Sequence, residues 1–316
     1  MSLVEIDNRK RAEEAPLFSG AKIYGADEIK VAPWNLGNFI VCGDAHSTLS
    51  EMPENFANVM VTSPPYYGQR DYGVTGQVGV ESNPADYIRR IVEIFREARR
   101  VLRHDGTLWL NLGDKYLDGQ LLGLPWRVAL ALSDDGWILR SDVIWHKANA
   151  MPSSVKNRPT TDHEYIFMFS KNGDYFYDAD SIREPHVTFS ENSKMRGGRR
   201  HLAKKNGTTP EAGKNSGNQN LHRGDNWDKM FHPLGRNKRT VWQVPLSKFR
   251  DAHFAVFPEK LIQPCILAGC PRDGVVIDPF FGSGTTGAVA RNNGRRFIGV
   301  EINPDYCKMA QQRFVM

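Results

Sequence analysis

The chain has 316 residues, of which 40% are hydrophobic and 24% charged, and its formal net charge is +5. This length is enough for one large domain or two modest ones, each with its own core. No stretch reaches the ~20 consecutive apolar residues of a membrane-spanning helix, and the charged N-terminus lacks the apolar segment of a signal peptide, so we expect a cytoplasmic protein with no membrane partner.

Short apolar runs alternate with amphipathic segments along most of the chain. Residues 84–103, for example, carry apolar side chains at spacings of three and four, which is the period of a helix. The predicted strands are residues 38–44, 58–63, 106–114, 137–147, 163–171, 274–280 and 295–302. The predicted helices are residues 84–103, 123–133, 258–269, 285–293 and 304–313. Strands that alternate with helices indicate an α/β fold, in which helices cover both faces of a parallel sheet.

The stretch TSPPYYGQRDYG, residues 62–73, directly follows a run that is predicted to be a buried strand. Pro64 and Pro65 lack a backbone N–H and fix φ, so the strand cannot continue through them. The chain therefore enters a stiff loop that carries Ser63 and Tyr66 at the end of the strand. Taken alone, this stretch is also typical of an ordinary turn with half-buried aromatic residues.

Basic residues are concentrated in one segment. Residues 183–250 contain 15 Lys and Arg against 5 Asp and Glu, whereas the rest of the chain carries more acidic than basic residues. Within this segment, residues 185–240 have almost no apolar periodicity and are too long for an ordinary connection. Such a composition is typical of a surface that faces phosphates or of a solvated, partly disordered loop, and it favours neither.

Residues 275–303 form a pattern of strand, glycine-rich turn, helix and a second strand that ends in an acid. Gly282 and Gly284 would let the backbone approach a ligand at the end of the first strand. Glu301 would accept hydrogen bonds from the two hydroxyls of a ribose, although it could instead cap the following helix. Because the full G-x-G-x-x-G spacing is missing, the pattern favours an adenosine without a pyrophosphate.

The two motifs together resemble the beta group of the amino-methylating DNA methyltransferases. TSPPY resembles the catalytic loop of that family, DPFFGSGTT resembles its cofactor loop, and the catalytic loop comes first, as in that group. The resemblance covers roughly residues 38–180 and 240–316, and it implies a circularly permuted, Rossmann-like methyltransferase sheet. It also implies a catalytic part at 1–184, a basic target-recognition insertion at 185–240 and a cofactor-binding part at 241–316.

The resemblance further implies S-adenosyl-L-methionine as the cofactor and double-stranded DNA as the substrate. The implied cofactor-binding residues are Asp44, Asp278, Pro279, Phe280, Gly282, Ser283, Gly284, Thr285, Glu301 and Asn303. Asp44 could instead cap a helix that begins near Ser47. The candidate DNA contacts are Arg196, Arg199, Arg200, Lys204, Lys205, Arg236, Lys238 and Arg239. No metal is expected, because a sulfonium methyl group is already activated.

The implied catalytic residues are Ser63, Pro64, Pro65 and Tyr66. An exocyclic amine of a base is a poor nucleophile, because its lone pair is delocalised into the ring. The Ser63 hydroxyl and the Pro64 carbonyl would accept hydrogen bonds from this amine, and Tyr66 would stack on a base flipped out of the duplex. Serine stands where adenine-methylating relatives usually have aspartate. The expected target is therefore N4 of cytosine, with N6 of adenine as the alternative.

The four cysteines form no C-x-x-C pair and have no histidine at zinc spacing, which favours reduced thiols and no structural metal. Cys265 follows a proline, like the nucleophile of cytosine ring-carbon methyltransferases. In those enzymes the cofactor loop precedes the cysteine, however, and here it follows. The apolar neighbours of Cys265 on its predicted helix indicate a core position.

Two other classes of function are compatible with the sequence. A methyltransferase for RNA or for a protein amide would use a similar proline–aromatic loop, although it has no evident need for an arginine-rich insertion. A nucleic-acid-binding module with a degenerate site is disfavoured by the intact SPPY and GSG motifs. A cognate restriction endonuclease is a possible partner, and both a monomer and a homodimer fit the sequence.

Overall fold

The computed structural model describes residues 21–32, 34, 37–185, 232–246 and 257–314. The chain divides into two compact units, a larger one of residues 1–177 and 240–316 and a smaller one of residues 178–239. Most of the basic segment falls within the smaller unit, and its residues 186–231 lie outside the described part of the chain.

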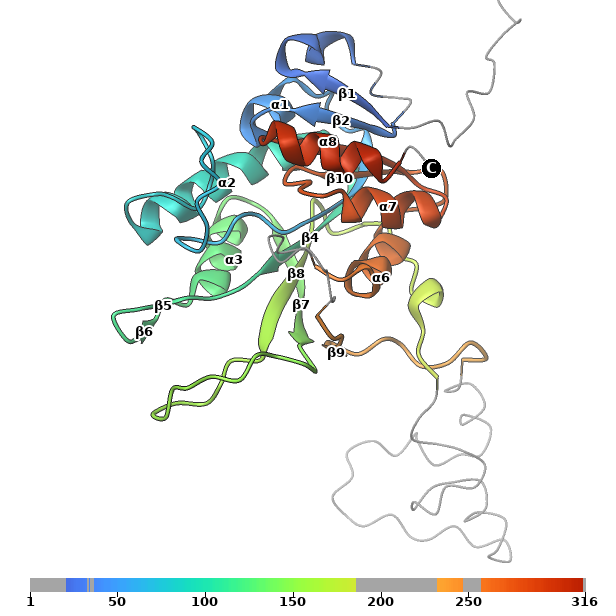
Figure 1. Cartoon of the computed structure of the whole chain (residues 1–316). Coiled ribbons are helices and arrows are strands. Elements are labelled where there is room, and N and C mark those ends of the chain that lie inside the picture. Colours follow the sequence, from blue (N-terminus) through green and yellow to red (C-terminus); the bar gives the residue numbers. More distant parts are fainter. Residues whose placement is uncertain (1–20, 33, 35–36, 186–231, 247–256, 315–316) are drawn as a thin grey trace, which may run out of the picture. The chain divides into compact units, whose positions relative to one another are not determined.

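Among the described residues, nine strands form the central sheet of the larger unit (Figure 1). In order across the sheet they are β1 (Lys22–Gly25), β2 (Phe39–Cys42), β11 (Arg296–Glu301), β10 (Val275–Asp278), β3 (Ala57–Thr62), β4 (Leu102–Leu112), β8 (His163–Ser170), β7 (Ile138–His146) and β9 (Val241–Gln243). All neighbouring pairs are parallel except those of β8, which is antiparallel to β4 and β7. The carboxyl ends of the parallel strands therefore meet at one edge of the sheet, together with the amino end of β8.

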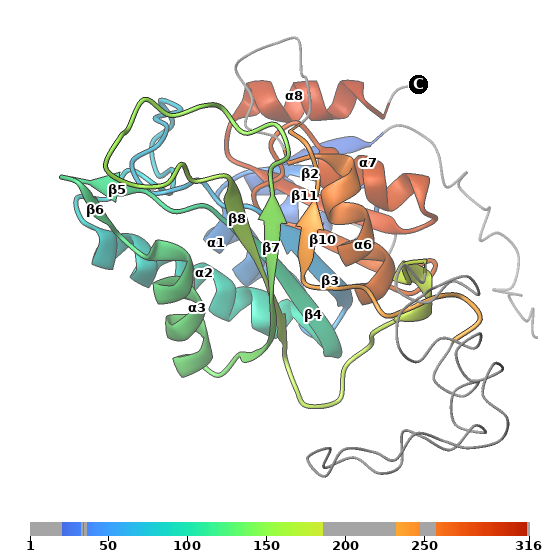
Figure 2. The same ribbon diagram turned by 90° about the horizontal axis from the view of Figure 1, so that it is seen from below.

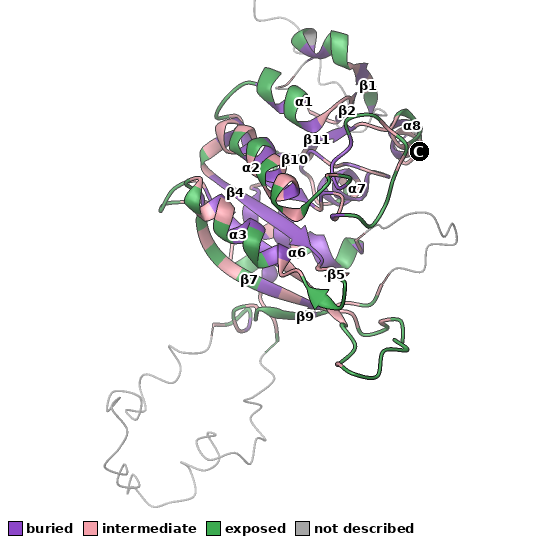
Figure 3. Cartoon of the chain, turned by 90° about the vertical axis from the view of Figure 1, so that its left-hand side faces the viewer, coloured by how far each residue is buried: buried purple, intermediate pink, exposed green. Residues whose placement is uncertain are grey.

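Helices cover both faces of this sheet (Figure 2). One face carries α1 (Ala45–Glu51), α2 (Pro84–Val101) and α3 (Leu124–Asp134), and the other carries α6 (Glu259–Gly269), α7 (Thr285–Asn292) and α8 (Pro304–Gln312). The inner strands are consequently apolar on both sides, and Val59, Met60 and Leu108 are fully buried, as the purple strands of Figure 3 illustrate. No helix of the described residues combines the length and the apolarity needed to cross a bilayer.

All of the predicted strands and helices are present, with ends shifted by a few residues. The helix predicted for residues 84–103 ends at Val101, because Leu102 pairs with Ala57 and already belongs to β4. The sheet departs from the predicted parallel arrangement at β8. No helix crosses between β7 and β8, so the chain returns in the opposite direction. The elements that are absent from the predicted strands and helices are short: β1, β9, α1, the 3-10 helices η1 (Ala26–Val31) and η2 (Asp180–Ile182), and the hairpin of β5 (Tyr116–Leu117) and β6 (Gln120–Leu121).

The described residues of the smaller unit are 178–185 and 232–239, and they include the 3-10 helix η2 (Asp180–Ile182). Glu184 and Arg236 form an isolated antiparallel bridge. The Glu184 carboxylate also binds the side chains of Arg236 at 3.3 Å and Lys238 at 3.1 Å. Two of the predicted DNA contacts are thus ion-paired within this unit.

Candidate active site

The carboxyl edge of the sheet borders a cavity of about 440 Å³. Its walls come from opposite ends of the sequence, and they meet because β11, β10 and β3 are neighbours in the sheet. The predicted catalytic residues all line it: Ser63, Pro64, Pro65 and Tyr66. Most of the predicted cofactor residues line it as well: Asp44, Asp278, Pro279, Phe280, Gly282, Ser283, Thr285 and Glu301. Gly284 and Asn303 belong to the adjoining turns and are not part of the lining.

The proline loop that follows β3 is fixed by α2. The Tyr87 hydroxyl donates a hydrogen bond to the Pro65 carbonyl at 3.1 Å, and the Arg90 guanidinium donates to the Gly76 carbonyl further along the loop. The Pro64 carbonyl accepts no hydrogen bond from the described residues. The loop is therefore held from one side, while the Pro64 carbonyl keeps its acceptor capacity for a ligand.

Ser63 and Tyr66 begin a chain of hydrogen bonds in the wall of the cavity. The Ser63 hydroxyl donates to the Tyr66 hydroxyl at 3.3 Å, and the Tyr66 hydroxyl donates to Glu164 at 2.7 Å. Burial and the charge of Glu164 raise the pKa of Tyr66 well above its ordinary value. The phenol thus keeps its proton and acts as a donor toward Glu164.

Glu164, at the amino end of β8, accepts hydrogen bonds from two further side chains. Its Oε2 accepts from the Asn111 amide at 3.1 Å, and its Oε1 accepts from the Lys147 ammonium at 2.5 Å. Sequence reasoning missed Glu164, Asn111 and Lys147, although each is a polar residue at the end of an apolar strand. Only the antiparallel return of β8 brings Glu164 to the edge where β4 and β7 end.

Gly113, directly after β4, is a second feature that sequence reasoning missed. A Cβ atom at this position would lie 2.6 Å from Cε2 of the Tyr66 ring, which is too close for any real contact. A residue without a side chain is therefore required for the Tyr66 ring to occupy its place in the wall.

The glycine turn between β10 and α7 has a backbone that only glycine adopts readily. Gly282 has φ +51° and Gly284 has φ +86°, and no atom lies within 4 Å of the position of a Cβ on Gly282. The Glu301 carboxylate accepts from the backbone N–H of Gly282 at 2.7 Å and from that of Asn303 at 2.9 Å. Each oxygen of Glu301 therefore keeps one further lone pair for a ligand.

Two groups beside this turn have capacity for a polar ligand. The Ser283 hydroxyl is buried and has no hydrogen-bond partner among the described residues. Glu301 is only 8% exposed, and burial raises its pKa above the ordinary value. A ligand that brings hydroxyl or amine donors would satisfy both groups, so the residues present fit a nucleoside such as that of S-adenosyl-L-methionine.

Asp278 is bonded on both oxygens within the protein. Oδ1 accepts from the Thr62 hydroxyl at 2.5 Å and the Phe280 N–H at 3.0 Å, and Oδ2 accepts from the Thr286 hydroxyl at 2.6 Å. Burial raises the pKa of Asp278 to about 6. Asp278 thus ties β3, β10 and α7 together beside the cavity.

The two capping alternatives have different outcomes. Asp44 caps α1, which begins at Ala45 rather than near Ser47, by accepting from the Ser47 N–H at 2.9 Å. Its other oxygen lies 3.9 Å from the Arg90 guanidinium, and the residue also lines the cavity. The capping alternative for Glu301 is wrong, because the side chain of Asn303 caps α8.

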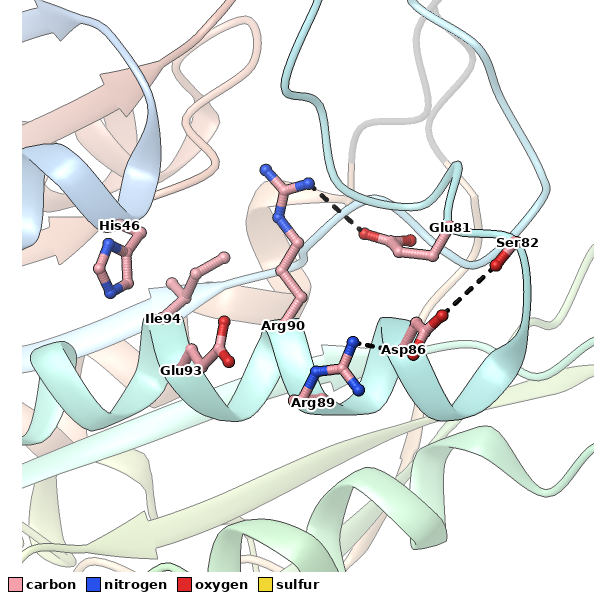
Figure 4. A pocket seen from close by; sticks show the side chains of 8 residues that line it. All are labelled: His46, Glu81, Ser82, Asp86, Arg89, Arg90, Glu93 and Ile94. Atoms are coloured by element: carbon pink, nitrogen blue, oxygen red, sulfur yellow. Dashed lines mark hydrogen bonds and ion pairs between the residues drawn. The ribbon is translucent and has the colours of Figure 1, made fainter.

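A second hollow, of about 400 Å³, lies beside α2 (Figure 4). Its charged groups pair with one another: Arg89 lies 2.9 Å from Asp86, and Arg90 lies 3.9 Å from Glu81. Figure 4 shows Arg90 reaching from α2 toward Glu81. Arg90 therefore lines this hollow and also donates to the Gly76 carbonyl of the proline loop.

The last candidates are Cys265 and the remaining basic residues. Cys265 is fully buried on α6, which confirms the predicted core position, and the four cysteines are free thiols. Arg239 is exposed. The predicted DNA contacts that lie outside the described residues are Arg196, Arg199, Arg200, Lys204 and Lys205.

The chain matches a protein-family model and is similar to several curated proteins, all of them methyltransferases or DNA methylases by description. Residues 57–312 match the family model described as DNA methylase. The chain is 40% identical over 300 residues to the type II methyltransferase M.Cfr9I of Citrobacter freundii, covering 86% of this chain and 85% of that protein. It is 38% identical over 305 residues to the type II methyltransferase M.SmaI of Serratia marcescens, with coverage of 87% and 90%.

Two solved structures share the fold. The PvuII DNA methyltransferase (cytosine-N4-specific) aligns with a TM-score of 0.63 and 19% identity over 95% of this chain and 89% of that one. The DNA modification methylase TTHA0409 of Thermus thermophilus, described as putative and complexed with S-adenosyl-L-methionine, aligns with a TM-score of 0.55 and 25% identity, covering 87% of this chain and 93% of that one.

Proposed function

This chain belongs to the DNA methylase family, the S-adenosylmethionine-dependent methyltransferases of amino groups in DNA, and from that premise we propose that it methylates the N4 amine of a flipped cytosine. One observation carries the proposal. The Ser63–Tyr66 loop lines the same cavity as the glycine turn at Gly282 and the neighbouring Glu301, so an amine held at the loop and a methyl donor held at the turn would meet.

The glycine turn is the side we assign to the cofactor. Glu301 would accept the ribose hydroxyls with its remaining lone pairs, and the unpartnered Ser283 hydroxyl would bond a polar group of the ligand. The open space at Gly282 admits the ligand close to the backbone. When bound, S-adenosyl-L-methionine supplies a methyl group that a positively charged sulfur has already activated.

The proline loop is the side we assign to the base. The Ser63 hydroxyl and the Pro64 carbonyl form an amine clamp, which accepts both amine hydrogens and leaves the nitrogen lone pair directed away from the ring plane. Two successive prolines and the bond from Tyr87 to Pro65 keep the clamp rigid, so little reorganisation is needed during reaction. The Tyr66 ring offers a stacking face, worth ~1–3 kcal/mol per base.

The choice of cytosine rests on Ser63. A neutral hydroxyl stands at the position where the adenine-methylating relatives usually carry a carboxylate, so we assign N4 of cytosine rather than N6 of adenine. The basic residues of the 185–240 segment would neutralise DNA phosphates, and binding should therefore weaken as salt concentration rises. We expect the enzyme to act in the cytoplasm, where a cognate restriction endonuclease would be its functional partner.

A methyl-transfer assay followed by mass spectrometry of the nucleosides tests this function. The purified chain, labelled S-adenosyl-L-methionine and genomic DNA that lacks the modification should yield N4-methylcytosine. RNA and total protein serve as matched substrates and should remain unlabelled. Label on N6 of adenine would overturn the assignment of the base, and label on RNA or protein alone would overturn the assignment of the substrate.

A further inference from the structure

The amine clamp contains an ambiguity that the sequence alone does not resolve. A serine hydroxyl both donates and accepts hydrogen bonds, and its proton rotates to suit its neighbours. The amine of a base offers donors, so a clamp residue is useful only when its lone pairs, and not its proton, face the amine. Ser63 must therefore place its proton elsewhere.

The Tyr66 hydroxyl is the acceptor toward which the Ser63 proton can point. The Tyr66 hydroxyl lies 3.3 Å from the Ser63 oxygen and has one proton. Two acceptors lie within reach of that proton, the Asn111 amide oxygen at 3.3 Å and the Glu164 carboxylate at 2.7 Å, and the closer, charged carboxylate takes it. Because the Tyr66 proton points to Glu164, the lone pairs of the Tyr66 oxygen can accept a hydrogen bond from Ser63. A carboxylate can only accept, so all donation in the chain runs from Ser63 through Tyr66 to Glu164.

Two neighbours fix Glu164 as the end point. Lys147 approaches Oε1 at 2.5 Å, and the Asn111 amide donates to Oε2 at 3.1 Å and to the Tyr165 carbonyl at 3.0 Å. The Glu164 side chain is only 14% exposed, so its orientation depends on these partners rather than on water. The carboxylate thus remains in one place for Tyr66 to bond.

We propose that Glu164, acting through the Tyr66 hydroxyl, is a positioning residue that turns the Ser63 proton away from the substrate and makes Ser63 an acceptor toward the amine. This inference rests on the proposed function, because it concerns the same clamp. It gives Tyr66 a second role besides stacking, and it explains why a tyrosine rather than a phenylalanine follows the two prolines in this chain.

Removing the phenol oxygen tests the proposal most directly. Tyr66→Phe keeps the aromatic face but leaves Ser63 without its acceptor, and it should slow the single-turnover rate of methyl transfer roughly tenfold. Glu164→Gln should slow that rate to a similar extent, because its amide can donate to Tyr66 and reverse the direction of the chain. Neither change should alter the Kd for S-adenosyl-L-methionine by more than about twofold.

The double variant Tyr66→Phe/Glu164→Gln distinguishes a shared chain from two independent effects. If both residues act through Ser63, the double variant should be no slower than the slower single variant. Tyr67→Phe is the matched control, since it removes the same atom from the next residue, which is buried outside the cavity lining; its rate should equal that of the wild type.

The outcomes separate this inference from the function on which it rests. A wild-type chain that methylates cytosine while Tyr66→Phe retains the full rate would overturn the role of Glu164 alone. Losses that multiply in the double variant would overturn it as well, since they would indicate separate contributions. A wild-type chain that methylates no DNA would overturn the proposed function and this inference together.

Discussion

The two sides of the cavity are built differently. On the glycine-turn side, backbone groups and buried apolar packing fix the site: Gly282 and Asn303 donate their N–H groups to Glu301, and Phe281 stacks on Phe297. On the proline-loop side, side chains fix the site, because Tyr66, Asn111 and Lys147 all bond the single carboxylate of Glu164.

This difference has a functional consequence. A site fixed by backbone geometry is part of the fold, so a substitution there should change cofactor affinity or stability. A site fixed by a side-chain network can lose one hydrogen bond while the fold persists, so a substitution there should change turnover. The two sides should therefore respond to mutation in separable ways.

The largest expected effect is that of Ser63→Ala on turnover. Loss of the clamp hydroxyl should lower kcat about 100-fold, the size typical of removing one preorganised polar contact from the reacting group, while the Kd for S-adenosyl-L-methionine stays unchanged. Steady-state kinetics together with calorimetric titration measure both quantities. Ser283→Ala removes a hydroxyl from the opposite side and should instead weaken the cofactor Kd. Unchanged kcat in Ser63→Ala would exclude Ser63 from the clamp.

Glu301→Gln tests the glycine-turn side. The amide keeps the shape but loses the charge and presents N–H groups to a backbone donor, so the Kd for S-adenosyl-L-methionine should rise roughly 30-fold. Titration calorimetry reports this Kd directly. Glu93→Gln, at an exposed position on α2, is the control and should bind as the wild type does. An unchanged Kd in Glu301→Gln would contradict the assignment of the cofactor side.

Asp278, beside the glycine turn, should make the stability of the protein depend on pH. The folded pKa of Asp278 is raised from 3.8 to about 6, so the folded state holds a proton that the unfolded state has already lost between these values. The wild type should therefore lose roughly 1–3 kcal/mol of unfolding free energy relative to Asp278→Asn as pH rises through this window. Urea unfolding of both proteins from about pH 4 to about pH 7 measures the difference, and a difference independent of pH would contradict the raised pKa.

Gly113→Ala should have the smallest effect. The added methyl group would push the Tyr66 ring out of place and lower turnover roughly fivefold, with little change in cofactor Kd. Gly173→Ala is a suitable control, because no atom lies within 4 Å of the position of its Cβ. Equal turnover in the two variants would show that the position of the Tyr66 ring does not matter.

Much of the fold could be predicted because its signals are local. The apolar period of residues 84–103 follows from the geometry of one helix, and the end of β3 follows from the chemistry of two prolines. The direction of β8 could not be predicted in this way. It depends on which strands accept β8 as a neighbour, and those partners, β4 and β7, come from other parts of the chain.

In the candidate site, too, some features could be predicted from short runs of residues and others depend on distant partners. The loop at Ser63 and the turn at Gly282 are recognisable from short runs of residues, and the structure places both in one cavity. Asp278 is predicted to contact the cofactor and lines the cavity, and its bonds to Thr62 and Thr286 also make it a tie between elements. That outcome depends on partners 216 positions away in the chain as well as 8 positions away.

The sequence by itself determined the two motifs, their order and hence the family, since each motif is a contiguous stretch whose backbone chemistry is set by its own prolines or glycines. Only the tertiary structure decided that Glu164 meets Tyr66, because the two residues are 98 positions apart and belong to different elements. A hydrogen bond over such a separation leaves no periodic or local pattern in the chain, and it exists only once the strands have paired.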